Sequence, residues 1–434
     1  RELARYYDCV TALDGQVGRL LAQLEEDGLA EKTIVFFYSD HGSGMPRHKR
    51  LLHDSGMRVP LIVRFPKKYQ HLAPAEPGRV VEELVSFVDF APTLLSLVGL
   101  EKPVRLQGRV FLGEGEEAEP EYVYGSRDRI DEVLDCARSI RDRRWLYIRN
   151  YFPHQGWAAP SVFSDLGEIR GEIKAFDGQR TVAQAHYVGG ERPVEELYDC
   201  EADPSNIVNL ATTERTDEQE AALVRMQEAF LAKRVEVRDV GALPEGEMWN
   251  WVRNEEASIL EIAAGETAHA PDLAAAWEAA DLVGTGSVEE LTALLAEGNP
   301  SRRFWGVIGL RNAAFGDEKI RGRMLDHLLD ASPAVAIEAA SWLANFEESQ
   351  QAALGVLKDH LGHEDWWTAL RACRAIELLG EKAVSLTGVM RELYDRTRDG
   401  TGDENLFLAF SAGAFLDSLG EETRAWDFAP KDSE

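Results

Sequence analysis

One short stretch, Thr33–His41, constrains the fold more than any other part of the chain. Its apolar and aromatic run, from Ile34 to Tyr38, stops abruptly at Ser39-Asp40-His41-Gly42. Such a run, rich in β-branched and aromatic residues, predicts a strand that is buried on both faces. Strands of this kind belong to α/β sheets covered by helices, and ligands bind outside their carboxyl ends. Asp40 and His41 therefore stand where an α/β enzyme keeps its reactive groups.

Asp40 and His41 together are candidate ligands for a divalent cation. The aspartate would bind through a carboxylate oxygen and the histidine through a ring nitrogen. The alternative is a surface turn, in which aspartate is a common residue. The dipeptide alone does not decide between a metal site and a turn.

A local excess of positive charge follows the predicted strand. Seven Lys and Arg residues and a single acid, Asp54, lie between Gly44 and Gln70, whereas the whole chain carries a formal net charge of −29. An anionic substrate needs such a basic island, because the charge of the rest of the protein would repel it. A solvated basic surface is the alternative, but it does not explain why the island adjoins a potential metal site.

Together these residues resemble the sulfatase family. The resemblance covers roughly residues 1–235 in order, and several linked motifs are more specific than one. It implies an α/β fold of the alkaline-phosphatase-like kind, with an incomplete sheet in this chain. The motifs that carry it are Ser39-Asp40-His41-Gly42, Lys49, His53-Asp54-Ser55-Gly56, Arg58–Arg64, Val88–Leu95, Gln107-Gly108-Arg109, Glu196–Asp199, Asp203-Pro204 and Asn209-Leu210.

The resemblance implies hydrolysis of a sulfate ester, or of an N-sulfate, on a carbohydrate. In such enzymes an Asp-His pair binds Ca²⁺ and a lysine contacts the sulfate. Asp40 and His41 are then the expected metal ligands and Lys49 the expected catalytic cation. The side chains expected to bind substrate are Arg47, His48, Arg127 and Arg129.

The roles of Arg127 and Arg129 have an alternative, and two histidines receive no functional role. Arg127 and Arg129 lie in a predicted loop after a strand, where guanidinium forks can bind sulfate oxygens. A solvated or internally paired loop is the other reading. His53 replaces the usual aromatic residue of its motif and receives no role. His186 stands alone among polar residues and is expected at the surface.

The nucleophile of the family has no counterpart in this chain. Sulfatases of this type use a formylglycine made from Cys or Ser in a Cys/Ser-x-Pro-Ser-Arg-like motif. No serine and none of the four cysteines lies in such a motif, and no Cys-x-x-Cys pair indicates structural zinc. We therefore expect the nucleophile and two further acidic metal ligands upstream of Arg1, and a fragment without turnover. The family resemblance favours a periplasmic or extracellular location.

Composition narrows the set of partners. The sequence pI near 4.8 argues against nucleic acid. No apolar run approaches the ~18 residues that a membrane span requires.

The chain divides into three predicted regions. Residues 1–240 form the carboxyl-terminal part of the sulfatase α/β domain with its small subdomain, 241–271 a linker, and 272–434 an all-α domain. Within the first region the pattern predicts a helix over 2–27 and strands over 33–39, 59–65, 121–126, 136–140 and 145–149.

Helical segments in the third region recur at a regular interval. Asn299-Pro300, Ser332-Pro333 and Glu364-Asp365 each precede an apolar stretch, at spacings of 33 and 32 residues. This pattern is close to that of paired-helix repeats and resembles HEAT-type repeats. Such stacks offer an extended surface for a protein partner. Because each repeat mainly contacts its neighbours, deleting them should leave the α/β part folded.

Two other functions stay open at this point. A phosphodiester or phosphonate ester hydrolase of the same superfamily shares the Asp-His metal pair, although Arg58-Val-Pro and Asp54-Ser55-Gly56 look more like sulfatases. A non-catalytic scaffold, in which the repeats bind a partner, is the second alternative. An intact nucleophile motif upstream would argue against the scaffold.

Overall fold

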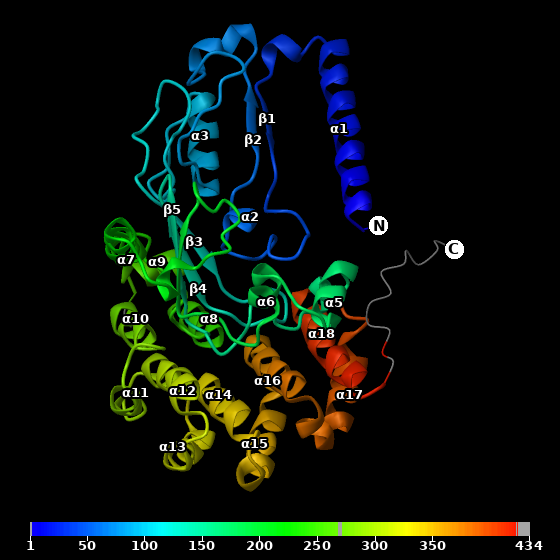
Figure 1. Ribbon diagram of the computed structural model, residues 1–434, viewed down its shortest axis with the longest axis vertical. Coiled ribbons are helices and arrows are strands. Elements are labelled where there is room, and N and C mark those ends of the chain that lie inside the picture. The colour runs from blue at the N-terminus through cyan, green and yellow to red at the C-terminus, as the bar shows by residue number, and fades with distance from the viewer. Residues whose placement is uncertain (1, 268–270, 422, 424–434) are drawn as a thin grey trace.

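The computed structural model describes residues 2–267, 271–421 and 423. From top to bottom in Figure 1 the chain forms a part built on two strands and a long helix, a four-stranded sheet with its helices, and a stack of helices. The three parts follow one another along the chain, as the colours from blue to red show.

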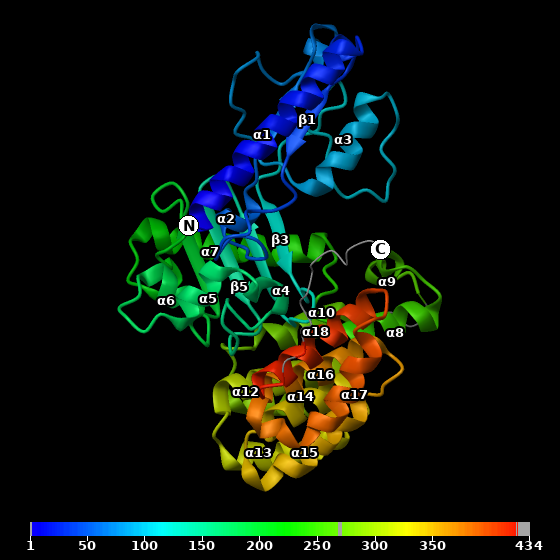
Figure 2. The ribbon, with the colours of Figure 1, turned by 90° about the vertical axis from the view of Figure 1, so that its right-hand side faces the viewer.

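The amino-terminal part contains helix α1 (Glu2–Glu26) and the antiparallel pair β1 (Val35–Tyr38) and β2 (Leu61–Arg64). These elements confirm the helix and the two strands that the sequence predicts here. The other helices are the single turn α2 (Asp54–Met57) and α3 (Phe90–Leu97). Helices α1 and α3 lie on opposite sides of the strand pair in both ribbon views (Figures 1 and 2).

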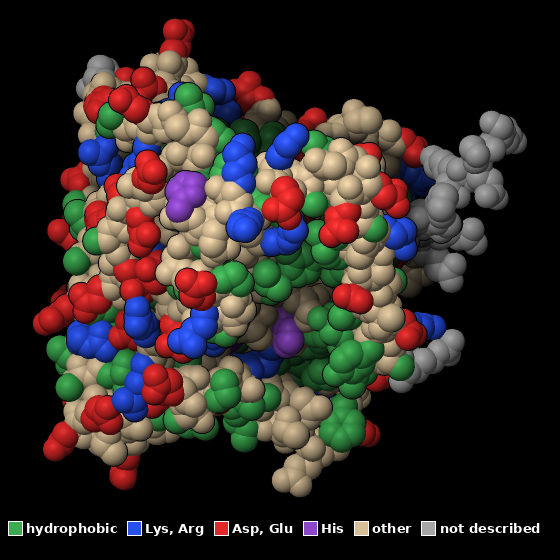
Figure 3. All heavy atoms as spheres, turned by 90° about the horizontal axis from the view of Figure 1, so that it is seen from above, with side chains coloured by type: hydrophobic (Ala, Val, Ile, Leu, Met, Phe, Trp, Pro, Cys, Tyr) green, Lys and Arg blue, Asp and Glu red, His purple; other side chains and the backbone are tan. Residues whose placement is uncertain are grey.

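The prediction that the first strand is buried on both faces is wrong for this structure. Among the described residues β1 pairs only with β2, and Tyr38 and Ile62 are 47% and 61% exposed. A sheet of two strands has too little surface to bury both faces of either strand. Seen from above, hydrophobic side chains gather around a hollow on this end of the molecule (Figure 3).

The middle part is an antiparallel sheet in the order β3-β4-β5-β6. Its strands are β3 (Val123–Arg127), β4 (Ala137–Arg141), β5 (Trp145–Asn150) and β6 (Glu195–Asp199). The three predicted strands of this region are confirmed with ends shifted by one or two residues. Helices α4 (Val162–Asp165), α5 (Glu168–Ala175) and α6 (Val182–Val188) connect β5 to β6, and α7 (Asp217–Glu236) follows β6.

Both faces of this sheet are covered. Alternate residues of a strand point to opposite faces. Accordingly Tyr147 packs with Phe230 of α7 on one face, whereas Leu146 and Ile148 pack with a different cluster on the other. That second cluster includes Leu51 and Leu52, which are 5% and 2% exposed. The basic loop that carries Lys49 is therefore anchored on the sheet.

The carboxyl-terminal part consists of helices throughout its described residues. They are α8 (Glu245–Glu255), α9 (Ile259–Ala264), α10 (Leu273–Asp281), α11 (Val288–Leu294), α12 (Pro300–Ala314), α13 (Glu318–Met324), α14 (Pro333–Leu343), α15 (Glu347–His360), α16 (Trp366–Leu379), α17 (Thr387–Thr397) and α18 (Asp403–Ser418). Within the described ranges, no helix of the chain combines the length and the apolar character needed to cross a membrane.

The predicted starts of three helices are confirmed. The side chains of Asn299 and Ser332 accept hydrogen bonds at the first turns of α12 and α14, and each helix begins with proline. Asp365 precedes α16. Ser, Asn and Asp are favoured at this position because they satisfy free N–H groups. Helices α10, α12, α14, α16 and α18 contact one another in succession.

The region predicted as a linker folds into two helices, and residues 268–270 lie outside the described residues. The expectation that its aromatic residues pack against a domain is confirmed, because Trp249 stacks on Trp367 of α16 with ring centroids 5.1 Å apart.

The hydrophobic core of the helical stack extends to residues that flank strands β4 and β5 of the sheet. Tyr151 and Phe152, which follow β5, pack against Trp305 of α12. Trp305 is 1% exposed and donates its indole N–H to the carbonyl of Ala242 at 2.8 Å. Removing the stack would therefore expose Tyr151 and Phe152 at the end of β5, whereas the clusters on the two faces of the sheet are separate from it.

Candidate active site

Asp40 and His41 lie just past the carboxyl end of β1, separated from it by Ser39, as the sequence predicts. His41 Nδ1 lies 2.7 Å from the carbonyl oxygen of Gly42. A carbonyl only accepts, so Nδ1 carries the proton and a neutral ring presents a lone pair at Nε2. Nε2 lies 3.5 Å from Asp40 Oδ2. In a neutral ring no proton separates these two atoms, which suits two ligands of one cation.

Close backbone packing holds this turn in place. The N–H of Gly42 donates to the carbonyl of Gly56 at 2.9 Å. A Cβ at Gly42 would lie 2.0 Å from the carbonyl oxygen of Ser55, and one at Gly56 would lie 2.4 Å from that of His48. Only glycine allows the backbones to approach this closely. The two glycines thus pack the Asp-His turn, the basic loop and α2 together.

The basic loop is wound tightly beside this turn. The N–H of Lys49 donates to the carbonyl of Ser43 at 3.0 Å. Arg47 and Arg50 adopt positive φ angles of 65° and 75°. Such angles cost energy for residues other than glycine, and they concentrate at functional sites. The strain makes this loop a candidate for function on structural grounds as well.

Lys49 and Arg50 contact one aromatic ring. Lys49 Nζ and Arg50 Cζ each lie 5.2 Å from the ring centroid of Phe163 in α4. Arg50 also donates to Ser161 at 3.2 Å and forms an ion pair with Asp131. Over the part of the chain that the structure describes, no carboxylate pairs with Lys49, so its ammonium group is free to bind an anion.

Arg47 and His48 share the loop with Lys49, but protein groups engage both side chains. Arg47 donates to the carbonyls of Ser205 and Asn206 at 3.0 and 2.7 Å. His48 Nδ1 lies 2.6 Å from Ser43 Oγ. Burial, with the charge of Arg47, lowers the pKa of His48. His48 is therefore a neutral ring at neutral pH, and Arg47 fastens the 205–206 segment to the loop.

Arg127 and Arg129 are paired within the protein rather than directed at a substrate. Arg127 ends β3 instead of lying in a loop, and it donates to the buried Asp135 at 2.6 Å. Arg129 donates twice to Glu245, at 2.7 and 3.1 Å, and lies 5.2 Å from the ring centroid of Trp366. Of the two interpretations of these arginines, substrate binding and pairing within the protein, the structure shows the pairing.

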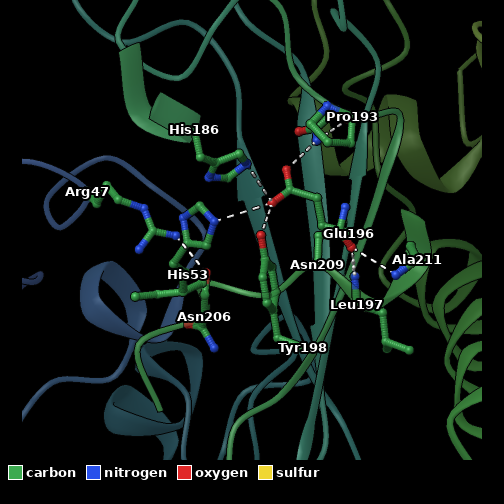
Figure 4. Close-up of polar contacts among 12 residues, drawn as sticks. Arg47, His53, His186, Pro193, Glu196, Leu197, Tyr198, Asn206, Asn209 and Ala211 are labelled. Atoms are coloured by element: carbon green, nitrogen blue, oxygen red, sulfur yellow. Dashed lines mark hydrogen bonds and ion pairs between the residues drawn. The ribbon is translucent and has the colours of Figure 1, made fainter. Parts of the chain in front are cut away.

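A buried polar cluster that the sequence does not single out surrounds Glu196 (Figure 4). One oxygen of this carboxylate lies 3.4 Å from His53 Nε2 and 3.7 Å from His186 Nε2, and it accepts a hydrogen bond from the Tyr198 hydroxyl. The other oxygen accepts from Asn150 at 2.7 Å. His53 and Glu196 are fully buried. The prediction of a surface position for His186 is wrong, because its ring faces Glu196.

Burial sets the charges in this cluster. It lowers the pKa of both His53 and His186, since a buried imidazolium loses its hydration. Burial alone would raise the pKa of Glu196, but hydrogen bonds from His53 and Tyr198, with the nearby imidazoles, lower it to about 2. At neutral pH the cluster holds one carboxylate and two neutral rings. The described residues contain no group of three or more His, Cys, Asp or Glu side chains placed to hold a metal.

One signal in the sequence could have pointed to the cluster. Glu196 falls within β6 two residues before Tyr198, so both side chains lie on one face of the strand, and an acid on an inward face requires partners. The partners themselves come from distant segments and carry no local pattern.

Comparison with known proteins gives matches to sulfatases. Residues 1–100 match the model of the sulfatase family. An ulvan-active sulfatase of Formosa agariphila is 38% identical over 256 residues, which cover 58% of this chain and 41% of that protein. Human N-sulphoglucosamine sulphohydrolase is 30% identical over 250 residues, covering 54% of this chain and 47% of that protein. The chain thus spans less than half the length of either relative.

Among solved structures, one similar chain is a protein bound to its substrate D-glucosamine-2-N,6-O-disulfate. The TM-score is 0.36 at 22% identity, covering 52% of this chain and 38% of that one. A score this low does not establish a shared fold. The comparisons thus show that this chain is similar to sulfatases, with the family model matching its first 100 residues.

Proposed function

We propose that this chain is part of an enzyme that hydrolyses sulfate esters, or N-sulfates, on a carbohydrate. The sulfatase match over residues 1–100 carries the proposal, because it contains the Asp40–His41 pair and Lys49, which no carboxylate pairs with among the described residues. The names of the relatives, an ulvan-active sulfatase and N-sulphoglucosamine sulphohydrolase, support a sulfated carbohydrate as the substrate class.

Calcium is the metal that we propose at Asp40 and His41. The carboxylate and the lone pair at His41 Nε2 fit two ligands of one ion, as their 3.5 Å separation indicates. Ca²⁺ takes about six to eight ligands, mostly oxygen, so these two leave most of the shell to water and to other residues. When bound, the cation would polarise the sulfate oxygens.

Lys49 is the residue that we propose to offset the charge on the sulfate during its transfer. A fixed cation aimed at developing negative charge stabilises the transition state without reorganisation. Its neighbour Arg50, held by Phe163, Ser161 and Asp131, limits the movement of the loop.

A formylglycine from a segment outside this chain is the proposed nucleophile. An exposed apolar surface on the first part of the structure supports such a segment. Leu3, Tyr7 and Leu20 of α1 are 54%, 62% and 63% exposed, and Ile62 of β2 is 61% exposed. Large exposed apolar side chains that gather on one part of a protein are typical of a place where further protein packs. We propose that the segment with the formylglycine covers it.

For the helical part we propose a HEAT-like repeat arrangement. Support comes from the successive contacts of α10, α12, α14, α16 and α18, and from the two confirmed helix starts that are 33 residues apart, at Asn299 and Ser332. A protein partner for its surface, and a periplasmic or extracellular location, are further proposals that rest on resemblance.

The test is to express a longer protein that contains this chain together with an upstream Cys/Ser-x-Pro-Ser-Arg-like segment. Matched aryl sulfate and aryl phosphodiester substrates are assayed with and without calcium. We expect calcium-dependent release of sulfate and little cleavage of the phosphodiester. Preferred cleavage of the phosphodiester would replace the proposal with the related hydrolase, and no turnover of either substrate would reject both.

A further inference from the structure

A positively charged cleft lies between the sheet part and the helical stack. Its volume is about 270 Å³. Loops 154–160 and 188–190 line one side, and helices α12, α14 and α16 line the other. Three arginines and one glutamate are its charged lining residues, whereas the whole chain carries a net charge of −29. A local excess of positive charge in a strongly acidic protein attracts anions to that place.

The three arginines are largely buried and incompletely neutralised. The side chains of Arg311, Arg371 and Arg374 are 20%, 10% and 3% exposed. Arg374 pairs with Glu377 and also donates to the carbonyl of Pro160. Glu338 serves both other arginines, at 2.6 Å from Arg371 and 3.7 Å from Arg311. Two guanidinium groups therefore share one carboxylate.

Arg311 is the least compensated of the three. Its ion pair with Glu338 is long, at 3.7 Å, and its guanidinium also donates to Ser341 Oγ at 3.2 Å. Burial lowers the pKa of Arg311, because the hydration that the charged guanidinium loses outweighs its attraction to Glu338. A buried cation in this condition is stabilised by any anion that can enter.

The opposite wall adds a buried polar atom without a partner. His154 Nδ1 lines this side and has no hydrogen-bond partner among the described residues. Burial lowers the pKa of His154 well below its ordinary value, so the ring is neutral. A neutral imidazole can donate to, or accept from, a hydroxyl group.

We propose that this cleft binds an anionic group of a sulfated carbohydrate, at a subsite separate from Asp40, His41 and Lys49. Guanidinium forks match the oxygens of sulfate and carboxylate, and the neutral His154 suits a sugar hydroxyl. The choice of a carbohydrate rests on the proposed function.

The two sites are close along the chain. Pro160 lines the cleft and holds Arg374, whereas Phe163 lies against Lys49. Three residues span at most about 11 Å. One polyanionic chain can therefore contact both sites, and helices α12, α14 and α16 would select for substrates longer than one sugar.

The experiment is calorimetric titration of the whole chain, residues 1–434, with a sulfated tetrasaccharide, its desulfated counterpart and inorganic sulfate. Arg311→Gln should weaken binding of the sulfated tetrasaccharide about 10- to 100-fold, the effect of losing a hydrogen bond to a charged group. The matched control is Arg323→Gln, because Arg323 is exposed on α13 and lies outside the cleft. It should leave the affinity unchanged.

A second variant guards against loss of folding. Gly190 lies at the exposed edge of the cleft, and an added Cβ there meets nothing within 4 Å. Gly190→Glu should fold normally, as a thermal melt will show, and should weaken binding by repulsion. Unchanged affinity in both Arg311→Gln and Gly190→Glu would overturn the proposal. Equal affinity for the sulfated and the desulfated tetrasaccharide would also overturn the proposal. If inorganic sulfate binds as tightly as the sulfated tetrasaccharide, the cleft recognises the anion alone and the carbohydrate part of the proposal is rejected.

A failure of the cleft proposal can be distinguished from a failure of the proposed sulfatase function. In the longer protein, Arg311→Gln should leave sulfate release from a small aryl sulfate unchanged, because that substrate does not reach the cleft. A parent enzyme inactive on aryl sulfates would reject the proposed function, while the titrations would still decide whether the cleft binds anions.

Discussion

His53 Nε2 lies 3.4 Å from a carboxylate oxygen of Glu196, and both side chains are fully buried. His53 is the residue immediately before α2, and Glu196 lies in β6, 143 positions later in the sequence. Their contact, with Asn150 and Tyr198 on the same carboxylate, joins the turn beside Asp40 and His41 to the four-stranded sheet. The position of the candidate metal ligands thus depends on a polar contact in the interior.

Glu196→Ala should lower the free energy of unfolding by about 3–5 kcal/mol, the usual cost of removing one partner of a buried polar pair. It leaves the Tyr198 hydroxyl and one of the two amide N–H groups of Asn150 without an acceptor. Urea unfolding measures the effect. The control is Glu289→Ala at an exposed position of α11, which should change stability by less than about 0.5 kcal/mol. Equal effects of the two variants would contradict the role given to Glu196.

Acid should destabilise the protein through the same cluster. Burial lowers the folded-state pKa of His53 below its ordinary 6.5, so the unfolded chain binds more protons below that pH. Stability is therefore complete above pH 6.5 and falls as the pH drops below it. Glu196, with a pKa of about 2, adds a further loss below its ordinary 4.5.

Unfolding by urea at about pH 8, 6.5 and 5 measures this dependence. His53→Phe removes the titrating ring, and its stability should change less between pH 6.5 and pH 5 than that of the parent. An identical pH dependence in the two proteins would exclude His53 as the cause.

The sequence predicts those features that depend on neighbouring residues. The starts of α12 and α14 follow from Asn299 and Ser332, because a helix cap needs only a side chain and the next three N–H groups. The place of Asp40 and His41 follows from the apolar run before them, which stops where β1 stops.

Features that depend on distant partners could not be predicted in this way. Arg129 was expected at a substrate because arginines in loops bind anions, but Glu245, 116 residues later, pairs with it. His186 has a polar sequence context, yet its ring faces Glu196. The contact between Trp305 and Tyr151 could not be predicted, because the helical periodicity of α12 does not reveal which distant residue Trp305 packs on.

Asp135→Ala should destabilise the protein by about 3–5 kcal/mol, because it leaves two buried arginines without their carboxylate. Arg127 and Arg192 donate to Asp135 at 2.6 and 2.8 Å. Their charges hold the pKa of Asp135 well below its usual range, although burial opposes this. Thermal melts compare this variant with Asp177→Ala at an exposed position. A melting temperature that matches the control would show that the network is dispensable.

Trp305→Ala should destabilise the sheet and the stack together. Truncating a buried tryptophan costs about 3–5 kcal/mol, and this one contacts residues of both parts. We expect a single unfolding transition at lower urea concentration, seen alike by helical circular dichroism and by hydrogen exchange in β4 and β5. Loss of protection in the stack alone would restore the idea of independent parts.

Lys49→Ala in the longer, active protein should lower the rate of sulfate release about 10²–10³-fold, as expected when one charged contact to a developing anion is lost. The structure leaves its ammonium group without a carboxylate partner among the described residues, so the substitution breaks no ion pair there. The melting temperature should therefore stay close to that of the parent. Lys67→Ala is the matched control, because Lys67 is exposed in the same basic island. Sulfate-release kinetics at saturating calcium compare the three proteins. A similar small decrease in both variants would assign the island a general electrostatic effect, and an unchanged rate in Lys49→Ala would remove this residue from the catalytic step.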